Sequence, residues 1–240
     1  MVTELRALDY IRGRVPLYTL REVASYVGIP ESTLGTWANG YVRHPPGRPL
    51  VTGGPVVTRL PGYAYGPSVP FIGLAEAMAL AALRRKDRIP LPKVRRVIEH
   101  LQRELGLEHA LASRNLFRVG ATFVYDYATT NGDVDLMELI ELRGGQAVWA
   151  DAVRQYLMNV AWDDGGWPVR IRVPRYPTAD VVMDPEHASG APYFAGSGVP
   201  VSSIVGRARG GDSAELLAED YDLTVARIRE VLADPIDAAA

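Results

Sequence analysis

The sequence of 240 residues contains no cysteine, so disulfide bonds, thiolate catalysis and cysteine-ligated metals are excluded. Its four histidines lack the spacing of metal ligands: His44, His100, His109 and His187. No run of eighteen apolar residues occurs, and the N-terminus lacks the apolar segment of a signal peptide. These absences predict a cytoplasmic protein with no membrane span and no metal site.

Positive and negative side chains are unevenly distributed along the chain, although the net charge is only −2. Residues 1–110 hold 15 Lys/Arg against 9 Asp/Glu, whereas residues 179–240 hold 4 against 11. A basic region can approach nucleic-acid phosphates, and an acidic region suits a basic protein partner. Nearly all of the basic residues are arginine, whose planar fork fits phosphate and guanine; a GC-rich genome produces the same bias.

The segment Tyr18–Gly40 has the pattern of a helix-turn-helix. Thr19 and Glu22 have capping-box spacing in front of an apolar run with helical periodicity. Gly28 allows a tight turn, and a second helix is predicted to begin at Pro30. The outer side of that helix carries short polar side chains suited to base edges and phosphates. A helical hairpin that packs without touching DNA is the alternative.

We assign the DNA contacts to polar and basic side chains of this unit and of the loop after it: Arg21, Ser32, Thr33, Thr36, Asn39, Arg43 and Arg48. The loop is rich in proline and glycine, and its β-branched stretch Val56–Leu60 predicts one strand of a hairpin or wing. Basic residues that follow a recognition helix contact phosphates in many DNA-binding proteins. A solvated loop is the alternative.

Residues 71–85 and 91–105 show the apolar periodicity of two helices, which completes a predicted DNA-binding domain over residues 1–110. Residues 111–178 predict a small mixed α/β insert that serves as a packing or dimerisation platform. Its expected elements are strands at 116–119, 122–127 and 134–142, a helix over 146–159 and a hairpin turn at 162–167.

No group of residues in the sequence supports catalysis. Asp133, Asp135 and Glu138 have no histidine beside them, and Asp163 fits a turn, where aspartate forms local hydrogen bonds. The glycine pairs lack the strand-to-helix pattern of nucleotide sites. We therefore expect a protein that is not an enzyme, with no catalytic residue, cofactor or metal.

Residues 179–240 predict a C-terminal module of three short helices, which begin near Pro200, Ser213 and Thr224. Because eleven acidic residues surround its four arginines, we favour protein docking over DNA binding for this module. A secondary contact with DNA or a partner is assigned to these arginines: Arg207, Arg209, Arg227 and Arg229.

Motifs of the C-terminal module resemble those of a bacterial antitoxin module: Asp184-Pro185, Gly190-Ala191-Pro192, Ala195-Gly196-Ser197-Gly198-Val199-Pro200, Gly210-Gly211-Asp212-Ser213 and Asp220-Tyr221. The whole chain is similar to the long VapB-type antitoxins, which join this module to a MerR-like helix-turn-helix. One departure is Ser197-Gly198, where the family has threonine-arginine, which puts the function of that arginine in doubt here.

The resemblance implies a helix-rich α+β protein with an N-terminal helix-turn-helix, the central insert and the C-terminal three-helix module. It also implies an antitoxin that binds a PIN-like ribonuclease toxin and represses its own operon as a homodimer on operator DNA. One alternative is a MerR-like regulator that senses a small ligand through aromatic residues of the insert: Trp149, Tyr156, Trp162 and Trp167. Another is an interaction protein that does not meet DNA.

Overall fold

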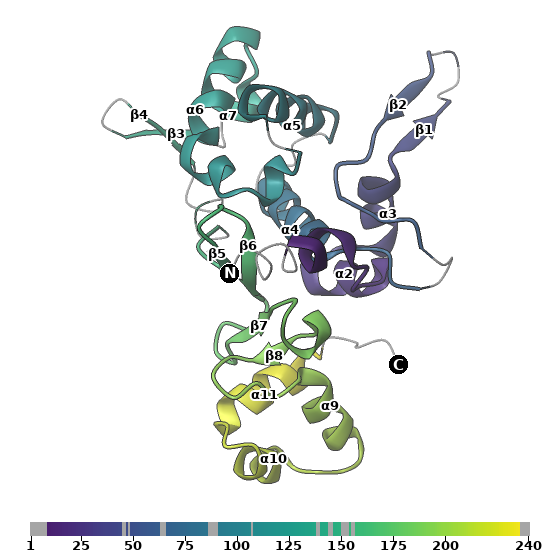
Figure 1. Cartoon of the computed structure of the whole chain (residues 1–240), viewed down its shortest axis with the longest axis vertical. Coiled ribbons are helices and arrows are strands. Elements are labelled where there is room, and N and C mark those ends of the chain that lie inside the picture. The colour runs from purple at the N-terminus through teal and green to yellow at the C-terminus, as the bar shows by residue number, and fades with distance from the viewer. Residues whose placement is uncertain are drawn as a thin grey trace.

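The computed structural model describes residues 9–44, 47, 49–62, 66–85, 91–106, 108–137, 140–143, 146–149, 154 and 157–235. It shows a helix-rich α+β protein, which confirms the predicted fold class. The winged N-terminal part and the helical middle lie together, and the C-terminal helices form a separate lobe below them (Figure 1).

Helices α2 (Leu20–Val27) and α3 (Glu31–Asn39) form the predicted helix-turn-helix. The predicted capping box is present, because the Thr19 hydroxyl accepts the Glu22 N–H and the Glu22 carboxylate accepts the Thr19 N–H. Gly28 ends α2 in the left-handed region at φ +72°, where glycine carries no steric cost.

Strands β1 (Tyr41–Arg43) and β2 (Val51–Gly53) follow α3 and pair antiparallel, with Tyr41 opposite Gly53. We call residues 41–53 the wing. The predicted strand at 56–60 is wrong, because its backbone donors have other partners. Two of these N–H groups, at residues 56 and 57, donate to the Trp37 carbonyl, and the Thr58 N–H donates to the Glu76 carboxylate.

Helices α4 (Phe71–Arg85) and α5 (Leu91–Leu105) match the two predicted helices, and the short η1 (Ala110–Ala112) follows. The predicted strands at 116–119 and 122–127 are wrong, because both segments lie in α6 (Arg114–Asn131). Buried residues of α6 recur at helical spacing: Gly120, Ala121, Val124 and Ala128. Packing of this helical face overrides the β-branched and aromatic character that predicted strands.

The next elements are α7 (Val134–Met137) and an antiparallel hairpin of β3 (Ile140–Arg143) and β4 (Gln146–Trp149). The predicted strand at 134–142 is right only at its end, because its first turn is helical. The predicted helix over 146–159 is wrong at 146–149, where backbone pairing with β3 forms a strand. Its residues 150–153, 155 and 156 lie outside the described part of the chain.

An antiparallel sheet connects the upper part of the molecule to the C-terminal lobe. It consists of β5 (Val160–Trp162), β6 (Pro168–Arg172), β7 (Val181–Met183) and β8 (Tyr193–Phe194), in that order. The predicted hairpin turn between β5 and β6 is confirmed. In it the Trp167 N–H donates to the Asp163 carboxylate at 2.8 Å.

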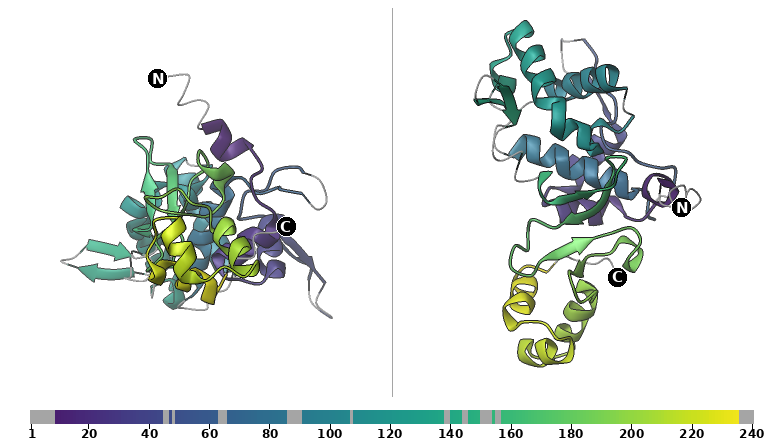
Figure 2. Two further views of the ribbon diagram at one scale, coloured as in Figure 1. Left: turned by 90° about the horizontal axis from the view of Figure 1, so that it is seen from below. Right: turned by 60° about the vertical axis from the view of Figure 1, so that its left-hand side comes forward.

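The C-terminal lobe contains η2 (Ala188–Gly190), α9 (Val201–Arg209), α10 (Ala214–Asp220) and α11 (Val225–Ala233). The right-hand view of Figure 2 shows its helices apart from the helical middle of the chain. The hydroxyls of Ser213 and Thr224 cap α10 and α11, as their positions in the sequence predict. The three predicted helices are therefore confirmed. Their mutual core includes Ile204, Leu217 and Ile228, which are fully buried.

Side-chain contacts fix the lobe against the helix-turn-helix. The buried Tyr18 hydroxyl, just before α2, donates to the Gly190 carbonyl at 2.9 Å. Arg175 donates to the Ser25 carbonyl of α2 and pairs with Asp234 beyond α11. Within the part of the chain that the structure covers, no helix combines the length and apolar character that a membrane crossing requires.

Candidate nucleic-acid interface

Helix α3 presents a polar face beside its buried one. Leu34 and Trp37 pack in the core, whereas Ser32 is exposed and Thr33 and Thr36 are half-buried. The Thr36 hydroxyl donates to the Ser32 carbonyl one turn earlier, at 2.9 Å, and keeps its lone pairs for another donor. Small hydroxyl side chains therefore line the outer side of the second helix, where a recognition helix meets DNA.

The C-terminal end of α3 is joined to the chain after the wing. The Arg59 guanidinium donates to the Asn39 amide oxygen and to the Ser68 hydroxyl. Asn39 is thereby held at the end of the helix with its amide nitrogen able to donate elsewhere. Arg59 is not among the predicted site residues, although it is a basic residue in the loop that follows the recognition helix.

Arg21 lies on α2 rather than on α3, with its side chain 78% exposed. Its Nε atom lies 3.5 Å from the Glu31 carboxylate at the start of α3, which is a long ion pair on the surface. An exposed pair of this kind contributes little to stability, so the guanidinium can exchange this partner for a phosphate. Arg48 lies outside the described residues.

Arg43 is exposed on β1, with its guanidinium carbon 4.9 Å from the centroid of the Tyr41 ring. The ring thus holds the cation above the base of the wing. The wing also exposes Val42, Leu50 and Val51. A hairpin that presents an arginine and apolar side chains to solvent has the composition of a surface that contacts a partner.

The four arginines assigned to a secondary contact in the C-terminal lobe are placed differently. Arg227 donates to the Ala179 and Ala195 carbonyls, at 2.8 and 3.0 Å, so it supports the turn that precedes α9. Arg229 pairs with Glu215 on α10. These side chains are used within the lobe.

Arg207 bridges Asp212 and Asp220, at 2.6 and 2.7 Å, and the hydrogen bonds that it donates to the Asp220 and Asp212 carboxylates raise its pKa. Arg209, in the last turn of α9, is exposed. The Arg207 bridge ties the end of α9 to both ends of α10, so its charge is neutralised within the lobe.

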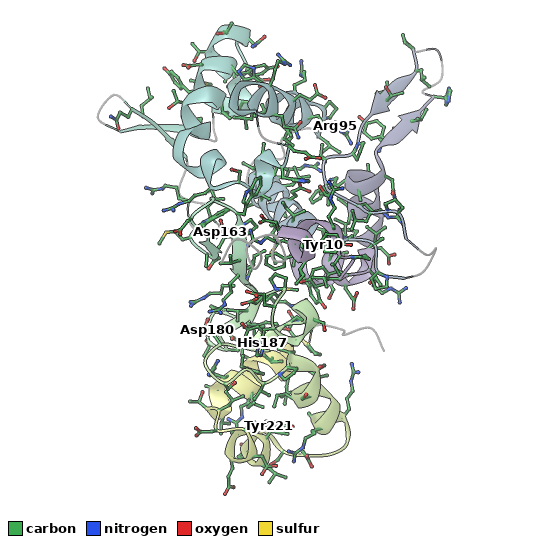
Figure 3. The ribbon with its side chains drawn as sticks, in the orientation of Figure 1. Tyr10, Arg95, Asp163, Asp180, His187 and Tyr221 are labelled. Carbon is green, nitrogen blue, oxygen red and sulfur yellow. The ribbon has the colours of Figure 1, made fainter. Side chains whose placement is uncertain are left out.

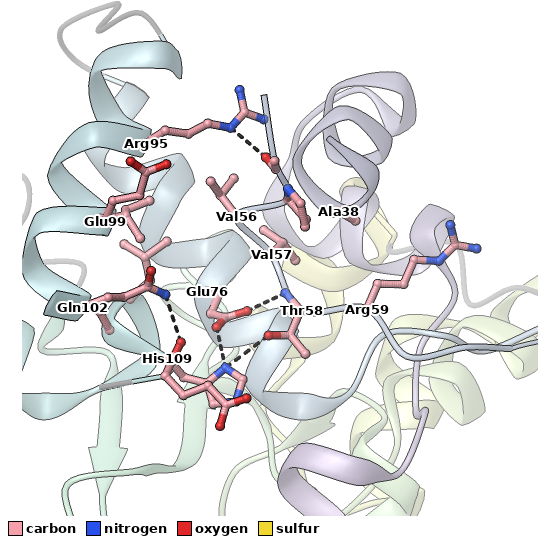
Figure 4. A pocket seen from close by; sticks show the side chains of 16 residues that line it. Ala38, Val56, Val57, Thr58, Arg59, Glu76, Arg95, Glu99, Gln102 and His109 are labelled. Atoms are coloured by element: carbon pink, nitrogen blue, oxygen red, sulfur yellow. Dashed lines mark hydrogen bonds and ion pairs between the residues drawn. The ribbon is translucent and has the colours of Figure 1, made fainter. Parts of the chain in front are cut away.

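A pocket of about 340 Å³ lies between the segment that follows the wing and the helices α4, α5 and η1 (Figure 4). At one end, the buried Glu76 carboxylate lies 2.9 Å from Nδ1 of His109, which also contacts the Thr58 hydroxyl. Burial by itself lowers the pKa of His109, but the hydrogen bond and charge of Glu76 outweigh it, so the pKa is raised. This pair is not among the predicted site residues, because Glu76 and His109 lie far apart in the sequence.

Of the acidic residues weighed as a metal site in the sequence, Asp133 has a backbone partner, and Glu138 lies outside the described residues. Asp133 accepts the Leu136 N–H at the start of α7, at 3.4 Å. Across the described ranges, no group of three or more His, Cys, Asp or Glu side chains is arranged to hold a metal ion.

Comparison with known proteins identifies the family. Residues 16–98 match the family described as "Putative DNA-binding HTH domain", and residues 181–233 match "Protein of unknown function (DUF433)". The chain is 38% identical over 228 residues to "Putative antitoxin VapB45" of Mycobacterium tuberculosis, which covers 92% of this chain and 95% of that protein. The chain belongs to the family of the long VapB-type antitoxins.

Two further proteins of Mycobacterium tuberculosis resemble this antitoxin-family chain. "Uncharacterized protein Rv2308" is 29% identical over 90% of this chain and 88% of its own length. The crystal structure of Rv2018 superposes with a TM-score of 0.80 at 35% identity, and covers 93% of this chain and 99% of that one. The arrangement of wing, middle and C-terminal lobe is therefore shared with a solved structure. The helix-turn-helix described above lies inside the DNA-binding family match.

Proposed function

We propose that this protein is an antitoxin that binds and neutralises a PIN-like ribonuclease toxin and represses its own operon by binding operator DNA. The observation that carries the DNA-binding half is the polar outer face of α3 beside an arginine-bearing wing. The antitoxin half is supported by the relative named as an antitoxin, which aligns over nearly the whole chain. The protein acts in the cytoplasm without catalysis of its own.

The two activities fall on different parts of the chain. Residues 1–110 form the DNA-binding domain, residues 111–178 the packing and dimerisation platform, and residues 179–240 the toxin-facing module. The acidic composition of the last part, with 11 Asp/Glu against 4 Lys/Arg, suits a basic protein that cleaves RNA. The internal pairing of its arginines supports the same division, because few cations remain there for DNA.

On DNA the protein acts as a homodimer. Two copies of α3 enter successive major grooves of a palindromic operator, roughly 34 Å apart. Ser32, Thr33 and Thr36 approach base edges, whereas Arg21 and Arg43 contact phosphates.

Two assays on the full chain test the proposal. In the first, the protein is co-expressed with the product of a neighbouring PIN-like gene, and complex formation and growth are measured. Co-purification with restored growth is the expected result. Separate proteins and no rescue would refute the antitoxin function. In the second, affinity for DNA upstream of the coding sequence is measured for Thr36→Ala and Arg43→Ala, and unchanged affinity in both would refute the assigned interface.

A second candidate function, a regulator that senses a small ligand, is favoured by the pocket beside Glu76 and His109 rather than by the aromatic residues of the insert. Its volume of about 340 Å³ is within the usual range for small-molecule sites. Trp162 and Trp167 are partly buried against the core, and Trp167 also lines a separate pocket with Arg12 and His109. This function predicts that a small ligand changes the affinity for DNA in the absence of any toxin. It also predicts that the pocket variant Gln102→Trp abolishes this change.

A further inference from the structure

We propose that Arg95 of α5 is a positioning residue that sets the angle of the wing for DNA without touching DNA itself. This inference rests on the proposed DNA-binding function. Arg95 lies between α5 and the β1–β2 hairpin (Figure 3), more than forty residues after the wing in the sequence. Its side chain reaches from α5 to the base of the wing.

The Arg95 side chain holds the wing through two contacts. Its Nε atom donates to the Gly54 carbonyl, just after β2, at 2.7 Å (Figure 4). Its guanidinium carbon lies 4.8 Å from the centroid of the Tyr41 ring on β1. Both strands of the wing are therefore tied at their base to one arginine, and the Tyr41 ring also carries the exposed guanidinium of Arg43.

Two glycines are closely packed at the base of the wing, whereas Gly54 and Arg95 face the pocket of about 340 Å³ on the other side. A Cβ at Gly53 would overlap the Arg95 guanidinium and the Tyr41 ring, and a Cβ at Gly40 would overlap the Gly53 carbonyl. Gly40 also has φ +71°, a conformation in which side chains are strained. Close packing of this kind permits one arrangement of the hairpin, so removal of Arg95 opens a gap beneath the wing.

Burial separates Arg95 from a direct DNA contact. The residue is 6% exposed, and its two terminal nitrogens are enclosed with no hydrogen-bond partner among the residues that the structure describes. A buried guanidinium in this state is costly, and the face of Tyr41 offsets part of that cost. Arg84 nearby has its pKa lowered by burial and by the charge of Arg95. Burial of the Arg95 guanidinium therefore lowers the free energy of unfolding. This cost indicates that an arginine at this position has a function.

A two-stranded hairpin with three-residue strands is marginally stable by itself. Without Arg95 we expect the wing to pivot about Gly40 and Gly54, so that Tyr41 and Arg43 together lose their fixed place relative to α3. The expected loss of DNA affinity is about tenfold, comparable with the loss of one or two phosphate contacts.

The test measures affinity for the upstream DNA with Arg95→Met in the wild-type and Arg43→Ala backgrounds. Arg96→Met is the control, because Arg96 is the exposed neighbour on the same helix. Positioning predicts that Arg95→Met weakens binding about tenfold in the wild type and adds little in Arg43→Ala. Arg95→Lys is expected to restore affinity only in part, because an ammonium cannot bond Gly54 and stack on Tyr41 together.

Equal losses from Arg95→Met in both backgrounds would show a direct contact and overturn the inference, as would unchanged affinity in Arg95→Met while Arg43→Ala binds weakly. Unchanged affinity in both Arg43→Ala and Thr36→Ala would instead refute the proposed DNA interface. If Arg95→Met does not fold, judged by its unfolding transition, Tyr41→Leu tests the same contact and must show the same dependence on Arg43.

Discussion

The winged helix-turn-helix and the C-terminal lobe are both built from short helices with hydroxyl or proline N-caps, but Arg43 of the first and three arginines of the second differ in their hydrogen-bonding partners. In the lobe, Arg207 and Arg229 pair with carboxylates, and Arg227 binds backbone carbonyls. In the winged unit, Arg43 rests on an aromatic ring and stays exposed.

This difference indicates that the existing partners of an arginine, rather than the number of arginines in a region, decide whether its side chain can bind a phosphate. An arginine that already has two carboxylates gains little from a phosphate, because the existing bonds must first be broken. An arginine on an aromatic face keeps its hydrogen-bond donors for a ligand. The contrast supports the proposal that the winged unit contacts DNA and that the arginines of the lobe stabilise its fold, and four changes test or sharpen it.

The largest expected effect is the destabilisation of the lobe by Arg227→Met. The change leaves the Ala179 and Ala195 carbonyls without their charged donor, and we expect a loss of about 2–4 kcal/mol in the free energy of unfolding. Urea denaturation of the full chain measures it. The control is Arg229→Met, whose exposed pair with Glu215 is expected to make no measurable contribution. Equal losses in the two variants would contradict the structural role of Arg227.

Thr36→Ala is expected to reduce DNA affinity by about 1–3 kcal/mol, the range for a lost base contact, with little change in stability. Thr129→Ala is the matched control, because its hydroxyl makes the same bond to a carbonyl one turn earlier, on α6. Fluorescence anisotropy with upstream DNA measures both variants. If Thr129→Ala weakened binding as much as Thr36→Ala, the effect would not belong to α3.

Arg43→Ala is expected to lower affinity less, and to reduce the slope of log affinity against log salt by about one. A titration series at several salt concentrations gives this slope. An unchanged slope would show that Arg43 does not neutralise a phosphate.

The smallest effect concerns pH. The pKa of His109 is raised in the folded state, so the contribution of its contact with Glu76 is fully present below the ordinary histidine pKa of about 6.5. That contribution is lost as the pH rises through the folded pKa. Glu108 adds to this effect and Arg14 opposes it. Unfolding midpoints are measured as the pH rises through the pKa of His109, and they are expected to vary less with pH in His109→Gln than in the wild type. Parallel curves of midpoint against pH for the two proteins would contradict the pairing of His109 with Glu76.

Local signals were sufficient for much of the fold. The capping box at Thr19, the turn at Gly28 and the caps at Ser213 and Thr224 each depend on residues within a few positions, so the sequence predicted these helix boundaries. The polar face of α3 followed from the same helix assignment. Its role in DNA contact stays a prediction.

Long-range contacts explain what the sequence did not predict. The local sequence of α6 predicts two strands, but the segment forms a helix because one of its faces packs in the core. The wing strands are three residues each and give almost no periodic pattern. Arg95 and the Glu76–His109 pair join residues far apart in the chain, so no local spacing marks them.

The most direct measurement of the central claim compares Arg43→Ala with Arg229→Ala, one exposed arginine from each region, in binding to the upstream DNA. The account predicts weaker binding and a smaller salt slope for Arg43→Ala, and wild-type binding for Arg229→Ala. Weakened binding in Arg229→Ala with wild-type binding in Arg43→Ala would contradict it, because DNA recognition would then belong to the C-terminal lobe.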